Sequence, residues 1–162
     1  MKGKINVRKA IETDISAIVA LWKEFMDFHK ERNRFFGRSA IAHEKFAEFI
    51  AGHIANESSC VLVAELDDLV VGHCLATISK YPPIYDVVEY GQIMDLAVTH
   101  KYRRKGVGET LVNAIRSWFL ARGIHRVEVR VAVSNEVSVA FWRKMGFRPY
   151  VETLCLKMEE KV

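Results

Sequence analysis

Hydrophobic residues recur along the chain with two different periods, which together predict an alternation of strands and helices. Alternating or continuous apolar runs predict about six strands, at Ile5–Lys9, Cys60–Glu65, Leu69–Ser79, Ile93–Val98, Arg126–Val133 and Phe147–Met158. Apolar residues at helical spacing predict four helices, which begin near Asp14, Ala42, Gly108 and Glu136. The order β-α-α-β-β-β-α-β-α-β indicates a single α/β domain over residues 1–162, with a mixed central sheet flanked by helices.

Several turn residues separate the predicted elements. Asp67-Asp68 lies between two strand-like runs and predicts a hairpin. Gly72, inside the second of these strands, marks either a bulge or a close approach of another part of the chain. Gly123 and Gly146 stand where two of the helices are expected to end.

Composition is that of an ordinary globular protein, with 50% hydrophobic and 27% charged residues among 162. No apolar run approaches ~18 residues, so we expect no membrane span. The N-terminal sequence has no long apolar segment of the kind found in secretory signals. These features, together with the cysteine usage, predict a cytoplasmic location.

The three cysteines, Cys60, Cys74 and Cys155, are far apart, and each lies inside an apolar strand-like run. An odd number without C-x-x-C spacing argues against a disulfide framework and against a zinc site. We therefore expect three small core residues. The six histidines are also scattered, without a metal-binding spacing, so no metal site is predicted.

The formal net charge of +4 and the pI of about 9.0 raise the alternative of a nucleic-acid-binding protein. However, the densest basic charge lies in one short segment, Lys101 to Lys105, and no basic strand interleaved with aromatic residues is present. Nucleic acid is therefore an unlikely partner.

The basic segment is part of a predicted anion-binding site. The apolar strand Ile93–Val98 is followed by Arg103-Arg104-Lys105-Gly106-Val107-Gly108 and then by a long amphipathic helix. Glycines allow a sharp turn in which backbone amides converge on a phosphate, and the helix N-terminus favours negative charge at the same point. A diphosphate is the expected ligand. The Walker A pattern is absent, and Leu111 replaces the third glycine of a dinucleotide fingerprint.

The remaining pattern, R-x-x-G-x-G after L-A-V at a strand end, resembles the acetyl-CoA-binding motif of the GNAT acyltransferase superfamily. Its context strengthens the resemblance, because Asp95-Leu96-Ala97-Val98 lies upstream and a helix follows. Asn135 and the segment Phe141–Phe147, FWRKMGF, follow further on, where the family usually has N, then A, then L-Y-x-K-x-G-F. The length of the chain and the order of its elements also fit the family.

The resemblance implies a GNAT-like fold whose sheet splays between the strand ending at Val98 and the strand ending near Val133. Acetyl-CoA would lie in that wedge as the co-substrate. We expect the family's last hairpin to be absent, because too few residues follow Phe147, so either the acceptor side is more open or a partner subunit of a homodimer fills it. The residues implied at the acetyl-CoA site are Leu96, Ala97, Val98, Arg103, Arg104, Lys105, Gly106, Val107, Gly108, Glu109, Thr110, Asn135 and Trp142.

Acetyl transfer to an amine needs a base for the ammonium proton and a way to release the thiolate. The strand positions that often supply a glutamate base in the family hold Gln92 and Met94, and Trp142 replaces the usual tyrosine acid. Glu89 lies nearer the loop, and we expect it to be the catalytic carboxylate, acting through water. Asp95 alternates away from Met94, so we expect it to cap a neighbouring loop instead.

These features predict an acetyl-CoA-dependent N-acetyltransferase that acts on a primary amine of a small molecule or a peptide. The alternative is an acyl-CoA-binding module without turnover. Two loops stay open as acceptor elements: Phe35-Phe36 either packs under the sheet or lines the acceptor pocket, and the aromatic residues of Tyr81–Asp86 either bind an amine or cover the sheet edge. His29 either contacts a ligand or is a partly exposed residue at a helix end.

Overall fold

The structure is a computed structural model that describes residues 3–31 and 39–158. The chain divides into two compact units, Met1–Arg130 and Val131–Val162, and each unit is described by itself below. The Phe35-Phe36 pair lies outside the described residues. The prediction of one domain over residues 1–162 stays a prediction.

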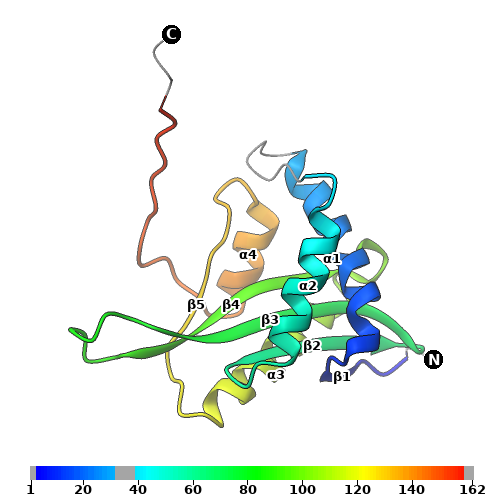
Figure 1. The fold of residues 1–162 in the computed structure, drawn as a ribbon, viewed down its shortest axis with the longest axis horizontal. Coiled ribbons are helices and arrows are strands. Elements are labelled where there is room, and N and C mark those ends of the chain that lie inside the picture. Colours follow the sequence, from blue (N-terminus) through cyan, green and yellow to red (C-terminus); the bar gives the residue numbers. More distant parts are fainter. Residues whose placement is uncertain (1–2, 32–38, 159–162) are drawn as a thin grey trace. The chain divides into compact units, whose positions relative to one another are not determined.

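The first unit holds a five-stranded sheet and three of the four described α-helices (Figure 1). Its strands are β1 (Asn6–Lys9), β2 (Ser59–Leu66), β3 (Leu69–Lys80), β4 (Glu89–Val98) and β5 (Val127–Val129). Its helices are α1 (Ile15–Lys30), α2 (Ala42–Ile54) and α3 (Val107–Leu120), with short 3₁₀ turns at Glu12–Asp14 and His100–Tyr102. The second unit contains α4 (Glu136–Lys144).

The strands follow one another across the sheet in chain order. β1 to β4 are antiparallel, and β5 pairs with β4 in parallel. The sheet is therefore mixed, as the sequence predicted. The predicted hairpin is also confirmed, because Asp67 and Asp68 connect β2 to β3 with φ values of 51° and 60°. Two positive φ values are typical of the tight hairpin turn that matches the twist of paired strands.

The helices cover opposite faces of the sheet. On one face, Ile18 of α1 and Ile50 of α2 join Val61, Val63 and Leu75 in a buried apolar cluster. On the other face lies α3, in which all five residues of the predicted apolar stripe are buried: Leu111, Val112, Ile115, Trp118 and Phe119. Helical periodicity therefore identified the buried side of α3 correctly.

Two glycines bring α3 close to the sheet. A Cβ added to Gly91 would lie 2.5 Å from the ring of Phe119, and a Cβ added to Gly72 would lie 3.1 to 3.2 Å from Ala97, Val107 and Leu111. Both interpretations of Gly72 hold, because the β2–β3 register also shifts beside it: Ala64 pairs with Gly72, whereas Glu65 pairs with Val70. These contacts also show which residues of β3 and β4 face α3, because Gly72 and Gly91 both lie on that side of the sheet.

Two predicted strands differ from the structure. The strand Arg126–Val133 is reduced to Val127–Val129, because its ladder with β4 ends at Val129. The strand Phe147–Met158 is wrong: this segment has no strand or helix. Alternating apolar residues specify a strand only where a neighbouring edge pairs with them.

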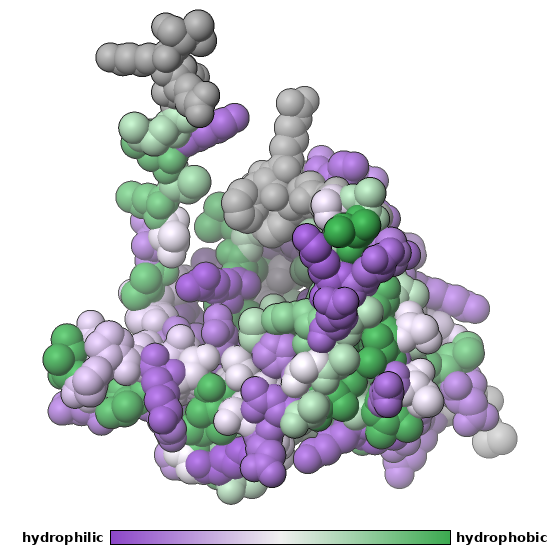
Figure 2. All heavy atoms as spheres, viewed as in Figure 1, coloured by the Kyte–Doolittle hydropathy of each residue, from purple (hydrophilic) through white to green (hydrophobic). Residues whose placement is uncertain are grey.

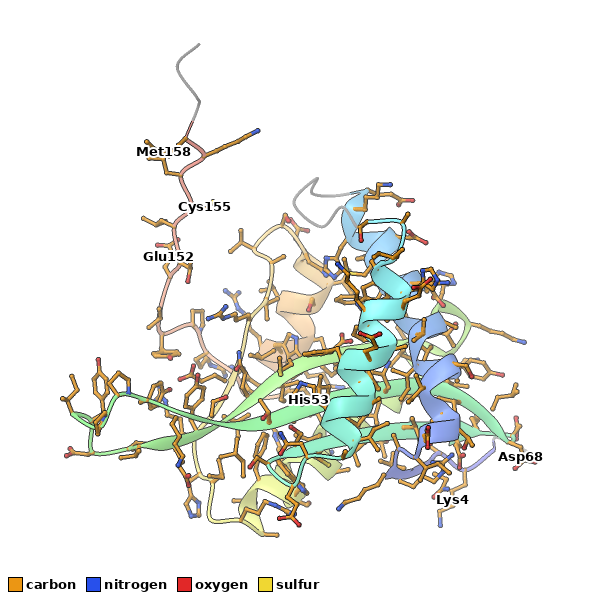
Figure 3. All side chains as sticks on the ribbon, viewed as in Figure 1. Lys4, His53, Asp68, Glu152, Cys155 and Met158 are labelled. Carbon is orange, nitrogen blue, oxygen red and sulfur yellow. The ribbon has the colours of Figure 1, made fainter. Side chains whose placement is uncertain are left out.

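The missing last strand also corrects the prediction for the cysteines. Cys60 and Cys74 are buried, as expected, whereas Cys155 is exposed in the extended C-terminal segment, where Figure 3 labels it between Glu152 and Met158. Among the described residues, no helix is long and apolar enough to cross a membrane. Over α1 and α2, polar and apolar residues are interspersed on the surface seen in Figure 2.

Candidate functional site

The segment between β4 and α3 is a tight turn that leaves backbone amides open. Arg104 and Gly106 have left-handed φ values of 59° and 87°, and Gly106 is the N-cap of α3. The first amide with an acceptor inside the helix is that of Thr110, which donates to the carbonyl of Gly106 at 2.9 Å. The amides of Val107 and Gly108, at the very start of the helix, precede the first residue that can donate within it, which favours an anion at this end.

Two side chains in the predicted site support the turn itself. Arg103 donates from Nε to the carbonyl of Val98 at 2.9 Å, and the Thr110 hydroxyl donates to the carbonyl of Gly106 at 2.9 Å. Arg103 also lies over the ring of Phe28 on α1, with 5.3 Å between its guanidinium carbon and the ring centroid. These contacts hold the loop in the conformation that exposes its amides.

Helix α1 also holds the start of this segment. Glu24 accepts hydrogen bonds from the Thr99 hydroxyl at 2.9 Å and from the amide of His100 at 2.6 Å. A carboxylate that accepts from a backbone amide and a hydroxyl is a strong, charge-assisted support. The loop that follows β4 is thus fixed from α1 on one side and from α3 on the other.

β4 carries a bulge in the middle of the predicted site. Leu75 pairs with Asp95, whereas the next residue of β3, Ala76, pairs with Ile93, so Met94 is an extra residue in β4. The parallel ladder to β5 also ends at Ile93. Among the described residues, Met94–Val98 therefore has a ladder with β3 only. Its other edge offers backbone groups that an extended ligand can pair with.

The candidate catalytic residues of β4 lie in different surroundings. Glu89 is the first residue of the strand, and its carboxylate is 3.6 Å from the Lys80 ammonium in an exposed ion pair. By strand alternation it shares the α3 face with Gly91. Its catalytic role stays a prediction. Gln92 lies on the opposite face, within 3.4 Å of the Ser79 hydroxyl.

Asp95 has a structural partner, though not the loop that the sequence suggested. Its carboxylate is 2.8 Å from Nε2 of His73 on β3, and the His73 side chain is fully buried. A buried imidazole needs such a polar partner to offset its lost hydration. His29 is likewise buried, against the rings of Phe25 and Phe28, and is not the partly exposed residue expected at a helix end.

In the second unit, Asn135 and Trp142 are both buried. The Asn135 side chain accepts a hydrogen bond from the Ser138 amide at 3.1 Å, so it caps α4. Trp142 makes edge contacts with the rings of Phe141 and Phe147, with both centroids 5.1 Å away. Each residue thus has a structural role within its own unit. Their binding roles stay predictions.

Sequence reasoning missed one polar cluster in the first unit. Tyr81, the residue after β3, donates its hydroxyl to Glu128 of β5, and Arg126 donates to both residues. The partners are 47 positions apart in sequence, and no spacing rule connects them. The sequence pattern drew attention to the aromatic residues of the Tyr81–Asp86 loop, but it did not indicate that Glu128 lies beside Tyr81.

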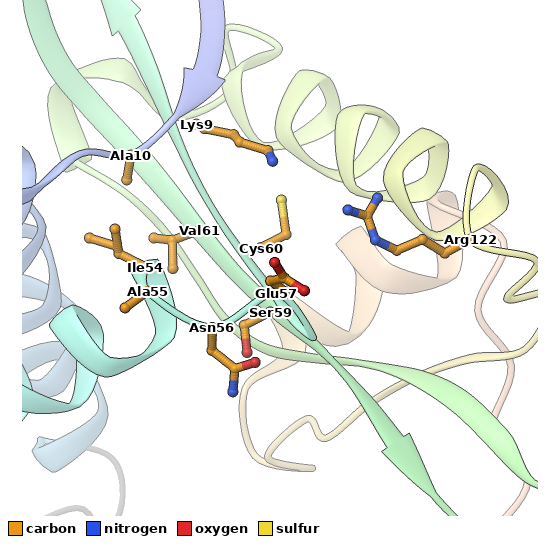
Figure 4. Close-up of a pocket in the computed structure, with 10 residues that line it drawn as sticks. All are labelled: Lys9, Ala10, Ile54, Ala55, Asn56, Glu57, Ser59, Cys60, Val61 and Arg122. Atoms are coloured by element: carbon orange, nitrogen blue, oxygen red, sulfur yellow. The ribbon is translucent and has the colours of Figure 1, made fainter.

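A cavity of about 440 Å³ lies near the opposite end of α3 from the glycine turn (Figure 4). Lys9, Cys60 and Arg122 line it, together with residues that follow α2. Burial raises the pKa of the Cys60 thiol, although the charges of Lys9 and Arg122 oppose this shift. The cavity contains none of the predicted site residues. In the described part of the chain, no group of three His, Cys, Asp or Glu side chains could hold a metal ion.

Comparison with known proteins agrees with the motif at the glycine turn. Residues 19–147 match the model of the acetyltransferase (GNAT) family. An N-alpha-acetyltransferase of Sulfurisphaera tokodaii is 26% identical over 153 residues, which cover 91% of this chain and 83% of the relative. An N-alpha-acetyltransferase of Sulfolobus acidocaldarius is 27% identical over 154 residues, with the same coverage of 91% and 83%.

Among solved structures, a predicted acetyltransferase with acetyl-CoA from Clostridium acetobutylicum has the same fold. The TM-score is 0.78 at 19% identity, over 95% of this chain and 96% of that one. The family match confirms the predicted enzyme class, an N-acetyltransferase, and the predicted co-substrate, acetyl-CoA. The chain therefore belongs to the acetyltransferase (GNAT) family.

Proposed function

We propose that this protein transfers the acetyl group of acetyl-CoA to the α-amino group of a polypeptide chain. The observation that carries the proposal is the turn at Gly106, which exposes the first amides of α3 directly after the free edge of β4. The acceptor class is supported by the archaeal relatives, which are named N-alpha-acetyltransferases and match 91% of this chain.

In this proposal the diphosphate of acetyl-CoA binds the amides of Arg104 to Glu109, and the basic side chains of Arg104 and Lys105 add positive charge. The pantetheine arm runs along the backbone of Leu96, Ala97 and Val98 like an added strand. Arg103 and Thr110 act mainly by holding the turn, since their side chains already bond to backbone carbonyls. Asn135 and Trp142 are proposed to contact the arm as well.

The chemistry requires a neutral amine beside the thioester carbonyl. An α-amino group has a pKa of ~7.7–8.0, so a large part of the acceptor is ammonium at neutral pH and must lose a proton before attack. A thiol has a pKa of ~8.5, so the thiolate can leave first and take its proton from water. Trp142 then has no acid role, because its indole N–H does not titrate in this range.

The test is turnover with two sets of acceptors. Purified protein is incubated with acetyl-CoA and either short peptides with free α-amino groups or small amines such as polyamines and aminoglycosides. We expect a mass increase of one acetyl group at the peptide N-terminus, and none on the same peptides when their α-amine is blocked. Acetylation of small amines alone would refute the acceptor class. CoA binding without turnover on either set would favour the non-catalytic acyl-CoA-binding module.

A single domain over residues 1–162, a homodimer and a cytoplasmic location are proposals here, and size measurements in solution test the homodimer. Nucleic acid as a partner predicts displacement of CoA by an oligonucleotide, which we do not expect.

A further inference from the structure

The cavity shown in Figure 4 has walls of two kinds. Its volume, about 440 Å³, lies within the range of small-molecule sites. Ala10, Ile54 and Val61 form an apolar side. The side chains of Lys9 and Arg122 point into the cavity from separate directions, at its other side. A ligand that fills the cavity therefore meets hydrocarbon at one end and two cations at the other.

The two cations converge on the thiol of Cys60. Lys9 is the last residue of β1 and Arg122 follows the end of α3, so separate elements bring them together. Burial raises the pKa of the Cys60 thiol, and the charges of Lys9 and Arg122 both oppose that shift. Both cations therefore lie within electrostatic reach of one sulfur. The thiol itself stays neutral at pH 7, so it does not neutralise them.

The charges of Lys9 and Arg122 are not matched inside the protein. Among the described residues, the Lys9 ammonium makes no hydrogen bond or ion pair. Arg122 lies over the ring of Trp118, with 4.4 Å from its guanidinium carbon to the ring centroid, and donates to the Trp118 carbonyl at 3.5 Å. These contacts hold the guanidinium without neutralising it. Glu57 is the one acid among the described residues of the lining, which leaves one positive charge in excess.

The apolar side is built from fixed parts of the chain. Ala10 and Val61 are both buried, and the amide of Ala10 donates to the carbonyl of Val61 at 2.8 Å, which ties the end of β1 to β2. Ile54 is the last residue of α2. A ligand with a short hydrocarbon body therefore meets an ordered apolar surface, whose coverage removes more of it from water.

We propose that this cavity binds a small carboxylate with a short apolar body. The carboxylate lies between the Lys9 ammonium and the Arg122 guanidinium, and the hydrocarbon covers the apolar side. Carboxylates accept charge-assisted hydrogen bonds from both kinds of cation, and the guanidinium fork matches their geometry. A single negative charge also balances the excess charge of the lining. The proposal does not depend on acetyl transfer, because the cavity contains none of the residues predicted to bind acetyl-CoA.

The experiment titrates the protein with isovalerate and with three matched probes. Isovaleramide keeps the shape and removes the charge, isopentylamine reverses the charge, and inorganic phosphate keeps negative charge without the hydrocarbon. Binding is followed through the amide signals of isotope-labelled protein by NMR, at constant ionic strength, with and without saturating CoA. The variants K9M and R122M each remove one cation. K4M is the control, because Lys4 is exposed and does not line the cavity.

We expect isovalerate to bind with a Kd of ~1 mM, which is within reach for a ligand of so few atoms. The amides that shift should be those of Asn56 to Val61 and of Arg122. CoA should leave this affinity unchanged. Bound isovalerate should also slow the alkylation of Cys60 by iodoacetamide, measured by mass spectrometry, but not that of the exposed Cys155.

The variants and the other probes test which groups recognise the ligand. K9M and R122M should each weaken isovalerate binding ~tenfold or more, the scale of one hydrogen bond to a charged group. K4M should bind isovalerate as wild type does. Isovaleramide, isopentylamine and phosphate should each bind wild type at least ~tenfold more weakly than isovalerate, because each lacks either the negative charge or the apolar body.

Several results would overturn the proposal while leaving the proposed acetyl transfer intact. Isovaleramide or phosphate that bound as tightly as isovalerate would show that the cations or the apolar side play no part. Displacement of isovalerate by CoA would place it in the acetyl-CoA site instead. The melting temperature of each variant is measured as well, because R122M also loses its contact with Trp118. If R122M did not fold, K9M would decide, and wild-type affinity in K9M would refute the site.

Discussion

Replacing Gly106 by alanine separates the backbone role of the glycine turn from its proposed role in binding. Gly106 has a φ of 87°, and no heavy atom lies within 4 Å of an added Cβ. The substitution therefore introduces no clash within the protein, only the strain of an L-residue in the left-handed region, ~1–2 kcal/mol. For a chain of this size, ligand-free Gly106→Ala should melt ~2–8 °C below wild type.

The effect of Gly106→Ala on CoA binding is separate from its effect on the stability of the ligand-free protein. In wild type, CoA at a hundred times its Kd should add ~2.7 kcal/mol of stability, which raises the melting temperature by ~5–11 °C. In Gly106→Ala the new methyl group stands where the diphosphate approaches the turn. A hundredfold loss of affinity would leave only ~0.4 kcal/mol, or ~1–2 °C, at the same CoA concentration. The assay is thermal unfolding with and without CoA.

Gly123 provides the matched control. It follows the other end of α3, has a φ of 73°, and likewise has no heavy atom within 4 Å of an added Cβ. Gly123→Ala should show the same loss in ligand-free stability and keep the full gain with CoA. If Gly106→Ala kept that gain as well, the turn would not hold the diphosphate, and the argument from open amides would fail.

Three further predictions test individual residues. Asp95→Ala leaves the buried His73 without its acceptor and should cost ~1–3 kcal/mol in urea unfolding, whereas Asp95→Asn should cost less; equal costs would contradict this contact. The hydrogen bond from Arg8 lowers the pKa of Asp14, so its stabilisation is full above the ordinary pKa of ~3.9 and is lost as pH falls through the lowered value. The stability difference between wild type and Asp14→Asn should therefore shrink in acid, and a constant difference would refute the assignment. Trp142→Phe should change kcat by less than ~tenfold, or ~1.4 kcal/mol, in steady-state kinetics, and a loss beyond ~100-fold with unchanged CoA affinity would indicate that the indole N–H acts in the reaction.

The elements that the sequence predicted well are those set by local pattern. The stripe from Leu111 to Phe119 is buried because helical spacing places those residues on one side of α3, whichever surface they meet. The turn at Asp67-Asp68 forms because these residues tolerate a positive φ, and the strands on both sides can pair without help from distant parts. The glycine turn before α3 is also set by its local sequence, because Gly106 tolerates the positive φ that the turn requires.

The two strands that were predicted wrongly depend on neighbouring strands, whose positions a single sequence does not reveal. Phe147–Met158 has the alternation of a strand, yet the segment has no ladder, and its Leu154 and Leu156 are 85% and 81% exposed. Val133 was expected at the end of a strand and is 89% exposed, because the ladder of β5 stops at Val129. Alternation states which residues share a face, but not whether a neighbouring edge is there to pair with them.

The bulge at Met94 is the feature that most changes the interpretation of the site. Side chains on a regular strand alternate, so Gln92 and Asp95, three positions apart, would face opposite sides. The extra residue reverses the alternation: Gln92 pairs with Thr77 and Asp95 with Leu75, and these two residues of β3 share one face. Gln92 and Asp95 therefore lie on the same face, beneath α1 and α2 rather than α3.

This reversal determines which side chains of β4 share a face with Asp95. Before the bulge, the residues on the face opposite α3 are Tyr90 and Gln92, neither of which accepts a proton at neutral pH, and after it Asp95 is bonded to His73. β5 has no bulge, and its ladder places Glu128 beside Gln92 on that same face. The register of the strands, and no sequence motif, places Glu128 beside Gln92, and for that reason sequence reasoning missed the carboxylate that accepts from Tyr81.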